Sequence, residues 1–129
     1  MDYGMTIRLR GPFAEVVGRV REALAGQGFG VLTEIDVQAT MREKLGEPME
    51  PYLILGACNP PLAHRALGVD RRIGLLLPCN VVVREDGDDT VVEAFDPRLM
   101  PGVAGRPQLE PVARQAAERL DAVLDALRD

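Results

Sequence analysis

Residues 81–95 read VVVREDGDDTVVEAF, and this stretch decides the fold. Two apolar, β-branched segments flank the turn at 86–89, which is the pattern of an antiparallel β-hairpin. The first strand is predicted over residues 73–85, with an interruption at Pro78, where the missing N–H donor implies a bulge or a sheet edge. The second strand is predicted over 90–95. The sequence therefore predicts an antiparallel sheet built around this hairpin.

Outward from the hairpin, the apolar pattern predicts further strands and two long helices. Three more strands are expected at residues 6–10, 29–35 and 52–58. Apolar residues at helical spacing predict one long helix over 13–24 and another over 109–127. Shorter helices are expected after the capping residues Asp36 and Asn59, and residues 96–107 are expected to form an irregular connector. The expected fold is α+β, with a sheet of about five strands and two long helices on one face.

The composition is that of an ordinary globular protein. Of the 129 residues, 47% are apolar and 27% are charged, so we expect a single domain over 1–129, with residues 1–4 as a non-core N-terminal extension. A net charge of −5 offers no basic surface for phosphates, and we expect no binding to nucleic acid. Because no apolar run approaches the ~18 residues that cross a bilayer, we expect no membrane association and a cytoplasmic location.

The central strands are apolar on both faces. Residues 53–55 and 81–83 are continuous apolar runs rather than alternating ones, so both faces of the sheet need cover. Two long helices cover one face, and an exposed apolar patch on the other face indicates an interface. We therefore expect a homodimer with two-fold symmetry. The alternative is that the short helices cover the second face.

Two Cys-Asn dipeptides supply the most reactive side chains. Cys58 directly precedes the predicted cap Asn59, where the amides and dipole of a helix start stabilise a thiolate. Cys79 follows Pro78 at the predicted strand irregularity, and the two cysteines could meet across the sheet. The alternative is inert core packing, because free cysteine is among the most buried residue types.

A metal site and an acid–base site can also be drawn from the sequence. Cys58, Cys79 and His64 would supply three donors suited to zinc or copper, although no Cys-x-x-Cys motif is present and His64 is expected to face solvent.

Glu34 and Asp36 share a strand face at i and i+2, a spacing that lets paired carboxylates split their pKa values. In the structural alternative Asp36 caps a helix, Glu34 pairs with an arginine, and Lys44 complements a helix C-terminus.

Four motifs together resemble one known family. They are LTEIDV at 32–37, KLG at 44–46, PYLILGACNP at 51–60 and LLPCNV at 76–81. In order and spacing they resemble the domain-of-unknown-function 302 (DUF302) family, over residues from about 5 to 127.

The resemblance implies a two-layer fold with a curved, mainly antiparallel sheet, helices on one side and short connecting helices, similar in outline to a half of the TATA-binding protein. It also implies a homodimer. DNA binding is not implied, because a fold does not carry a function. The positions that match the family motifs are the first candidates for ligand binding: Glu34, Asp36, Lys44, Cys58, Asn59 and Cys79.

The sequence is compatible with three functions. The leading hypothesis is a dimeric binding module in which the region of Cys58 and Cys79 takes a small ligand or a soft metal. The second is a thiol-based redox or sulfur-handling enzyme with Cys58 as the reactive thiolate and Cys79 as the resolving thiol. The third is a structural or interaction protein without chemistry. The sequence names no cofactor and leaves open whether the protein is an enzyme.

Overall fold

Five strands form one open antiparallel sheet in the computed structural model, which describes residues 2–128. The spatial order is β1-β5-β4-β3-β2, so the predicted hairpin lies near the middle of the sheet. The strands are β1 (Gly4–Arg10), β2 (Gly30–Asp36), β3 (Tyr52–Cys58), β4 (Cys79–Asp86) and β5 (Asp89–Phe95). The antiparallel α+β prediction is confirmed, and β1 begins two residues earlier than expected.

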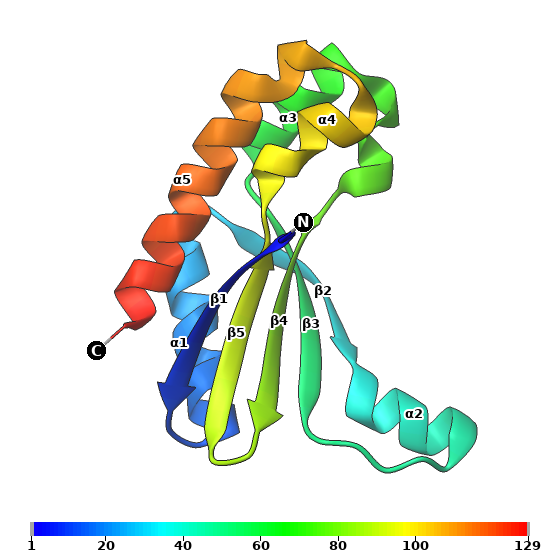
Figure 1. Cartoon of the computed structure of the whole chain (residues 1–129), viewed down its shortest axis with the longest axis vertical. Helices are drawn as coiled ribbons and strands as arrows, with labels where there is room; N and C mark the ends of the chain where they lie inside the picture. The colour runs from blue at the N-terminus through cyan, green and yellow to red at the C-terminus, as the bar shows by residue number, and fades with distance from the viewer. Residues whose placement is uncertain (1, 129) are drawn as a thin grey trace.

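The helices fall into three groups in space (Figure 1). The α-helices are α1 (Phe13–Gly26), α2 (Val37–Leu45), α3 (Pro60–Val69), α4 (Met100–Ala104) and α5 (Glu110–Leu127); the 3₁₀ helices are η1 (Arg71–Leu76), η2 (Pro97–Leu99) and η3 (Pro107–Leu109). Helices α1 and α5 lie together on one face of the sheet, and α3, η1 and α4 form a lobe at one end of it. Helix α2 projects from the opposite end.

The main core lies between the sheet and the two long helices. Alternate strand residues such as Leu55 and Val83 contribute to it, and Val20 and Leu24 of α1 meet them from the helix side. All four are fully buried. Burial of each such side chain contributes about 1.5–3 kcal/mol, so the amphipathic stripes of α1 and α5 hold the two layers together.

The lobe contains a second cluster and corrects one predicted strand. Residues 71–76 form η1 rather than the start of a strand, and β4 begins only at Cys79. Asp70 accepts a hydrogen bond from the backbone N–H of Arg72 at 3.0 Å and starts the helical turn. Ile73 and Leu76, three residues apart, face the second cluster, while Leu75 is 78% exposed. This three-residue period is that of a 3₁₀ helix, which the continuous apolar run concealed.

The connector at 96–107 is also more regular than predicted. It contains η2, α4 and the start of η3. The carboxylate of Asp96 accepts a hydrogen bond from the N–H of Arg98 at 3.0 Å and caps η2. Gly105 ends α4 with a φ of +67°, which a residue without a Cβ adopts freely. The connector therefore contributes ordered walls to the lobe.

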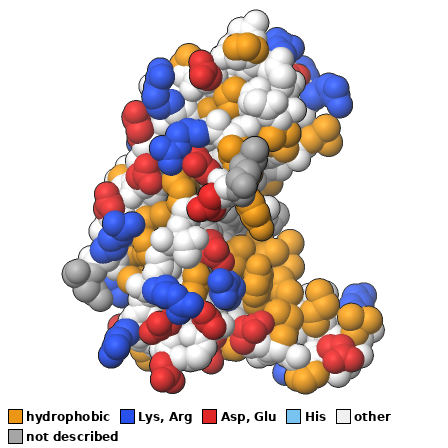
Figure 2. All heavy atoms as spheres, viewed as in Figure 1, with side chains coloured by type: hydrophobic (Ala, Val, Ile, Leu, Met, Phe, Trp, Pro, Cys, Tyr) orange, Lys and Arg blue, Asp and Glu red, His pale blue; other side chains and the backbone are white. Residues whose placement is uncertain are grey.

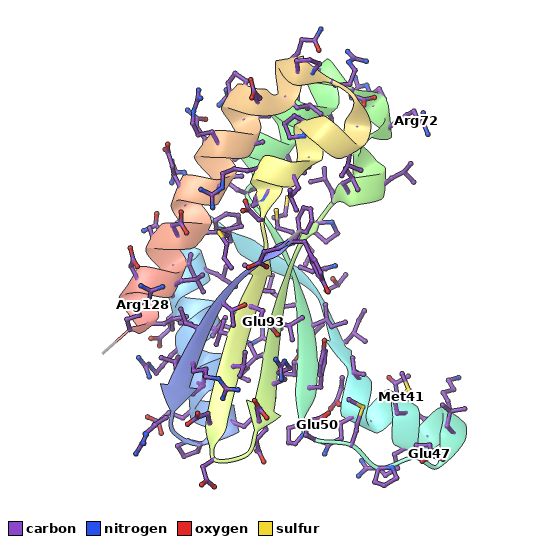
Figure 3. The ribbon with its side chains drawn as sticks, viewed as in Figure 1. Met41, Glu47, Glu50, Arg72, Glu93 and Arg128 are labelled. Carbon is purple, nitrogen blue, oxygen red and sulfur yellow. The ribbon has the colours of Figure 1, made fainter. Side chains whose placement is uncertain are left out.

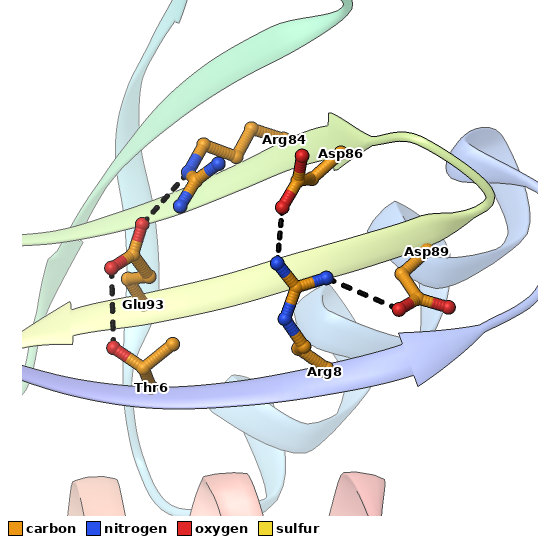
Figure 4. A network of polar contacts seen from close by, with 6 residues as sticks. All are labelled: Thr6, Arg8, Arg84, Asp86, Asp89 and Glu93. Atoms are coloured by element: carbon orange, nitrogen blue, oxygen red, sulfur yellow. Dashed lines mark hydrogen bonds and ion pairs between the residues drawn. The ribbon is translucent and has the colours of Figure 1, made fainter.

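The open face of the sheet is divided into two halves. On the β1–β5–β4 half, polar side chains form a network of ion pairs and hydrogen bonds (Figure 4). Arg8 bridges Asp86 and Asp89, and Glu93 accepts from Arg84 at 2.9 Å and from Thr6 at 3.1 Å. Val91 of β5 is paired with Arg8 on one side and with Arg84 on the other, and it is only 1% exposed. The aliphatic stems of Arg8 and Arg84 shield Val91 from solvent, so this half of the open face is covered without a second copy of the chain.

The other half of the open face is apolar and uncovered. Leu32 is 67% exposed and Ile35 is 49% exposed on β2, and α2 has no buried residue. Figure 2 shows hydrophobic side chains on the sheet next to α2 and on the projecting segment. Figure 3 shows Met41 and Glu47 on that segment, apart from the main body.

Within residues 2–128, no helix combines the length and the apolar character needed to span a membrane.

Candidate functional site

A cavity of about 40 Å³ lies where the main core meets the lobe. Its walls come from segments far apart in the sequence: the end of β3, the start of β4, α3, the start of α4, and α5. The lining residues are Phe29, Ala57, Cys58, Asn59, Leu62, Ala63, Ala66, Leu77, Pro78, Cys79, Met100, Leu109, Val112, Ala113 and Ala116. We call it the thiol cavity, because both cysteines line it and, apart from Asn59, the other lining residues are apolar.

Asn59 fixes the wall where β3 passes into α3. Its Oδ1 accepts a hydrogen bond from the N–H of Leu62 at 3.3 Å, which confirms the predicted cap. Its Nδ2 donates to the backbone oxygen of Gln27 at 3.3 Å and ties this cap to the turn after α1. Gly28 lies in that turn with a φ of +81°, and a Cβ there would stand 3.0 Å from Nδ2 of Asn59. Both ends of the Asn59 amide thus have structural partners.

The two cysteines enter the cavity from neighbouring strands. Ala57 of β3 lies opposite Cys79 of β4, so Cys58 is one position further along the chain, and strand alternation directs its side chain to the other face of the sheet. Both are free thiols; Cys79 is buried and Cys58 is half-buried. Burial, with a smaller contribution from the charge of Cys58, raises the pKa of the Cys79 thiol to about 11. Cys79 is therefore protonated at neutral pH, which disfavours a role as an attacking thiolate.

Gly56 allows the chain to close around this end of the sheet. A Cβ on Gly56 would collide with Oγ1 of Thr33 and would lie 2.9 Å from Cγ of Pro78. Only a residue without a side chain lets β2 and the segment before β4 approach β3 so closely. A glycine inside an apolar strand pattern is the sequence signal for such an approach, and our sequence analysis did not use it.

The other candidate residues lie at the far end of β2. Gly30 pairs with Cys58 and Asp36 with Leu53, so Asp36 is roughly 20 Å along the strand from the cavity. Asp36 accepts from the N–H of Ala39 at 2.9 Å as the cap of α2, and Glu34 pairs with Arg21 at 2.7 Å. Lys44 lies in the last turn of α2. The structure brings Cys58, Asn59 and Cys79 together and places Glu34, Asp36 and Lys44 elsewhere.

The structure also tests the three-donor metal set of Cys58, Cys79 and His64. His64 is exposed on α3 and does not line the cavity. Across residues 2–128, no three His, Cys, Asp or Glu side chains come together in a way that could hold a metal ion.

Sequence reasoning missed part of the wall. Met100 and the small residues Ala113 and Ala116 line the cavity, but Met100 lies in the connector that was expected to be irregular. The alanines were recognised only as part of the apolar stripe of the last helix. Their small size leaves the space that the cavity occupies.

Comparison with known proteins gives a consistent assignment of the fold. The family model described as "Domain of unknown function DUF302" matches residues 5–127. A solved structure, the uncharacterized conserved protein DUF302 from Bacillus stearothermophilus, is 31% identical in sequence, with a TM-score of 0.93. The match covers 99% of this chain and 100% of that one. No curated protein matches this chain.

Proposed function

This chain belongs to the DUF302 family, and we propose that it is a small-ligand-binding module whose site is the thiol cavity. One observation carries the proposal: Cys58 with Asn59, and Cys79 from a separate part of the sequence, line the same largely apolar cavity between two hydrophobic clusters. Ligand sites are typically concave and apolar, with a few convergent polar groups. Here those groups are the thiols of Cys58 and Cys79.

The dimensions of the cavity restrict its ligand. A volume of about 40 Å³ exceeds the ~10–15 Å³ that one water needs but is well below the ~150 Å³ of a cavity that holds benzene. The ligand is therefore a species of few heavy atoms, or a larger molecule that inserts one end. The apolar lining favours an uncharged or soft group over a hard ion, because a hard ion would lose its hydration without compensation.

We further propose that the module works as a homodimer. The β2 edge and α2 form the uncovered half of the open face, and Leu45 on α2 is 67% exposed. Helices as short as α2 are marginally stable in isolation, so cover from a second copy would stabilise this one.

Free thiols at Cys58 and Cys79 agree with a reducing cytoplasm.

The two other functions receive less support. A redox enzyme would need Cys79 to react as a thiolate, and its raised pKa opposes this at neutral pH. A purely structural protein has no need for a cavity at the junction of its two clusters, because filling such space stabilises a core.

Native mass spectrometry of protein purified without a chelator or an affinity tag tests the proposal. We compare the wild type with Ala116→Val, which fills the cavity, and with Ala122→Val, a matched change on α5 outside it. Both alanines are half-buried in the free chain. The wild type and Ala122→Val are expected to carry an extra mass that denaturation releases, and Ala116→Val is expected to lose it. An equal extra mass on all three proteins, or none on any, would overturn the proposal.

A further inference from the structure

We propose that the thiol cavity takes the apolar end of a small carboxylate, whose charged group binds Arg119 and Arg65 at the rim. This inference rests on the proposed function and names the ligand class of the same site. Arg119 belongs to α5 and Arg65 to α3, and other residues of both helices line the cavity. Apolar walls then hold one part of the ligand, and two guanidinium groups hold the other.

Arg119 lies directly beside the wall of the cavity. Its Nη1 donates to the backbone oxygen of Gln27 at 3.3 Å, and Nδ2 of the lining residue Asn59 donates to the same oxygen at 3.3 Å. A Cβ on Gly28 would stand 3.0 Å from Nδ2 of Asn59 and 4.0 Å from Nη1 of Arg119. The guanidinium of Arg119 and the amide of Asn59 are therefore neighbours.

Arg65 brings a second guanidinium to the same edge of α5. Its Nη1 donates to Oε1 of Gln115, and this hydrogen bond joins α3 to α5. Gln115 and Arg119 are four residues apart, and residues at this spacing are neighbours on one face of a helix. The side chains of Arg65 and Arg119 thus meet α5 one turn apart.

The lining of the cavity is partly exposed next to this edge. Most lining residues are buried, but Ala63 of α3 and Ala116 of α5 are among those that are only half-buried. Ala116 follows Gln115 directly and precedes Arg119 by three residues, so it shares the same part of the helix surface. An apolar group that enters beside Ala116 therefore leaves its other end close to Arg119.

The positive charges of Arg65 and Arg119 have no acidic partner in the structure. Within residues 2–128 both guanidinium groups bond only to neutral oxygen atoms. Other arginines of the chain form ion pairs with Asp or Glu: Arg8, Arg21, Arg84, Arg98 and Arg128. Each neutral acceptor orients its guanidinium and leaves the charge and most of the five N–H donors available. The pair can therefore attract an anion although the whole chain has a net charge of −5.

A carboxylate with an apolar tail matches both parts of this arrangement. The planar fork of a guanidinium binds a carboxylate through two parallel N–H···O hydrogen bonds. The cavity of about 40 Å³ admits only the end of a tail, and a hydrocarbon end needs no polar partner in an apolar lining. The charged group stays at the rim among water and guanidinium donors, so no charge has to be buried.

Isothermal titration calorimetry with three matched compounds tests the site. Hexanoate has both the tail and the charge, hexan-1-ol has the same tail without the charge, and acetate has the charge without the tail. We expect the wild type to bind hexanoate roughly 10-fold more tightly than hexan-1-ol and to show no measurable binding of acetate. The advantage of hexanoate is expected to shrink at high salt, because salt screens exposed charges.

Substitutions separate the charged group from the tail. Arg119→Gln and Arg65→Gln are each expected to weaken hexanoate binding roughly 3–5-fold and to leave the binding of hexan-1-ol unchanged. Arg114→Gln changes another exposed arginine of α5 and is the matched control, with no expected effect on either compound. Ala116→Val fills the cavity and is expected to weaken the binding of both compounds.

Equal wild-type affinity for hexanoate and hexan-1-ol would rule out the carboxylate site, and so would unchanged hexanoate binding in both arginine variants. If Ala116→Val still weakens both compounds in that case, the proposed function stands without this inference. If no compound binds, this inference fails, and the retained mass in native mass spectrometry alone decides the proposed function. A retained mass that is identified as a carboxylic acid would support both.

Discussion

The side chain of Asn59 joins two distant parts of the chain: its Nδ2 donates to the backbone oxygen of Gln27 at 3.3 Å while its Oδ1 caps α3. Asn59 is buried, so loss of its amide leaves polar backbone groups without partners. We expect Asn59→Ala to lower the free energy of unfolding by about 1–2 kcal/mol, measured by urea denaturation. Asn80→Ala, at the exposed asparagine of the second Cys-Asn dipeptide, is the matched control and is expected to change stability little. Equal losses for both variants would contradict the assigned role.

Gly56 gives a second prediction about packing. In Gly56→Ala the new methyl group meets Oγ1 of Thr33 and Cγ of Pro78, and β2 or the segment before β4 must move. We expect a loss of about 1–3 kcal/mol in the free energy of unfolding. Gly18→Ala, on the exposed side of α1 with no heavy atom within 4 Å of the new Cβ, is expected to stabilise by up to about 1 kcal/mol. Thermal unfolding of both variants checks the contrast, and a stabilised Gly56→Ala would refute the close approach.

The raised pKa of Cys79 predicts a loss of stability in alkali. In the folded protein burial holds this pKa at about 11, whereas an unfolded thiol ionises near pH 9. The protonated Cys79 thiol makes its full contribution to the free energy of unfolding below pH 9. This contribution falls between pH 9 and 11, because the unfolded state loses the proton first. We expect roughly 2 kcal/mol of extra loss over this range relative to Cys79→Ala, measured by denaturation at several pH values. Parallel stability curves for the two proteins would show that the thiol ionises freely in the folded state.

We predict that Leu45 on the projecting helix α2 lies in the dimer interface. A charge in place of this exposed leucine cannot be buried against a second copy, so Leu45→Glu is expected to shift a dimer to a monomer in sedimentation velocity. Leu75→Glu changes an even more exposed leucine on η1, in the lobe, and is expected to leave the dimer intact. A monomeric wild type, or dissociation by Leu75→Glu alone, would argue against the α2 interface.

Local patterns predicted the elements that depend on them. The hairpin, the stripes of α1 and α5, and the caps Asp36 and Asn59 are each specified within a few residues, and all are present. The apolar run at 75–77 was wrongly predicted to lie in a strand. Continuous apolar residues suit a buried strand as well as a short 3₁₀ helix that faces a second cluster.

The candidate site was only half predictable for a related reason. Cys58, Asn59 and Cys79 lie in motifs that end or begin strands, and their positions followed from the sheet. Met100 joins them through the path of a connector, and Ala116 through the packing angle of a helix, and neither leaves a local signal. The distance of Glu34 and Asp36 from the cavity likewise follows from the direction of β2, which places them at the opposite end of the strand.

The position of the thiol cavity has a consequence for the energy landscape of the chain. One wall belongs to the cluster of the sheet and the other to the cluster of the lobe, so we expect the residues on the two sides of the cavity to open separately when it is empty. An occupant that contacts both walls makes their unfolding one event. Filling this small space would turn two weakly coupled cooperative units into one, and the binding energy would appear as hydrogen-exchange protection spread over both.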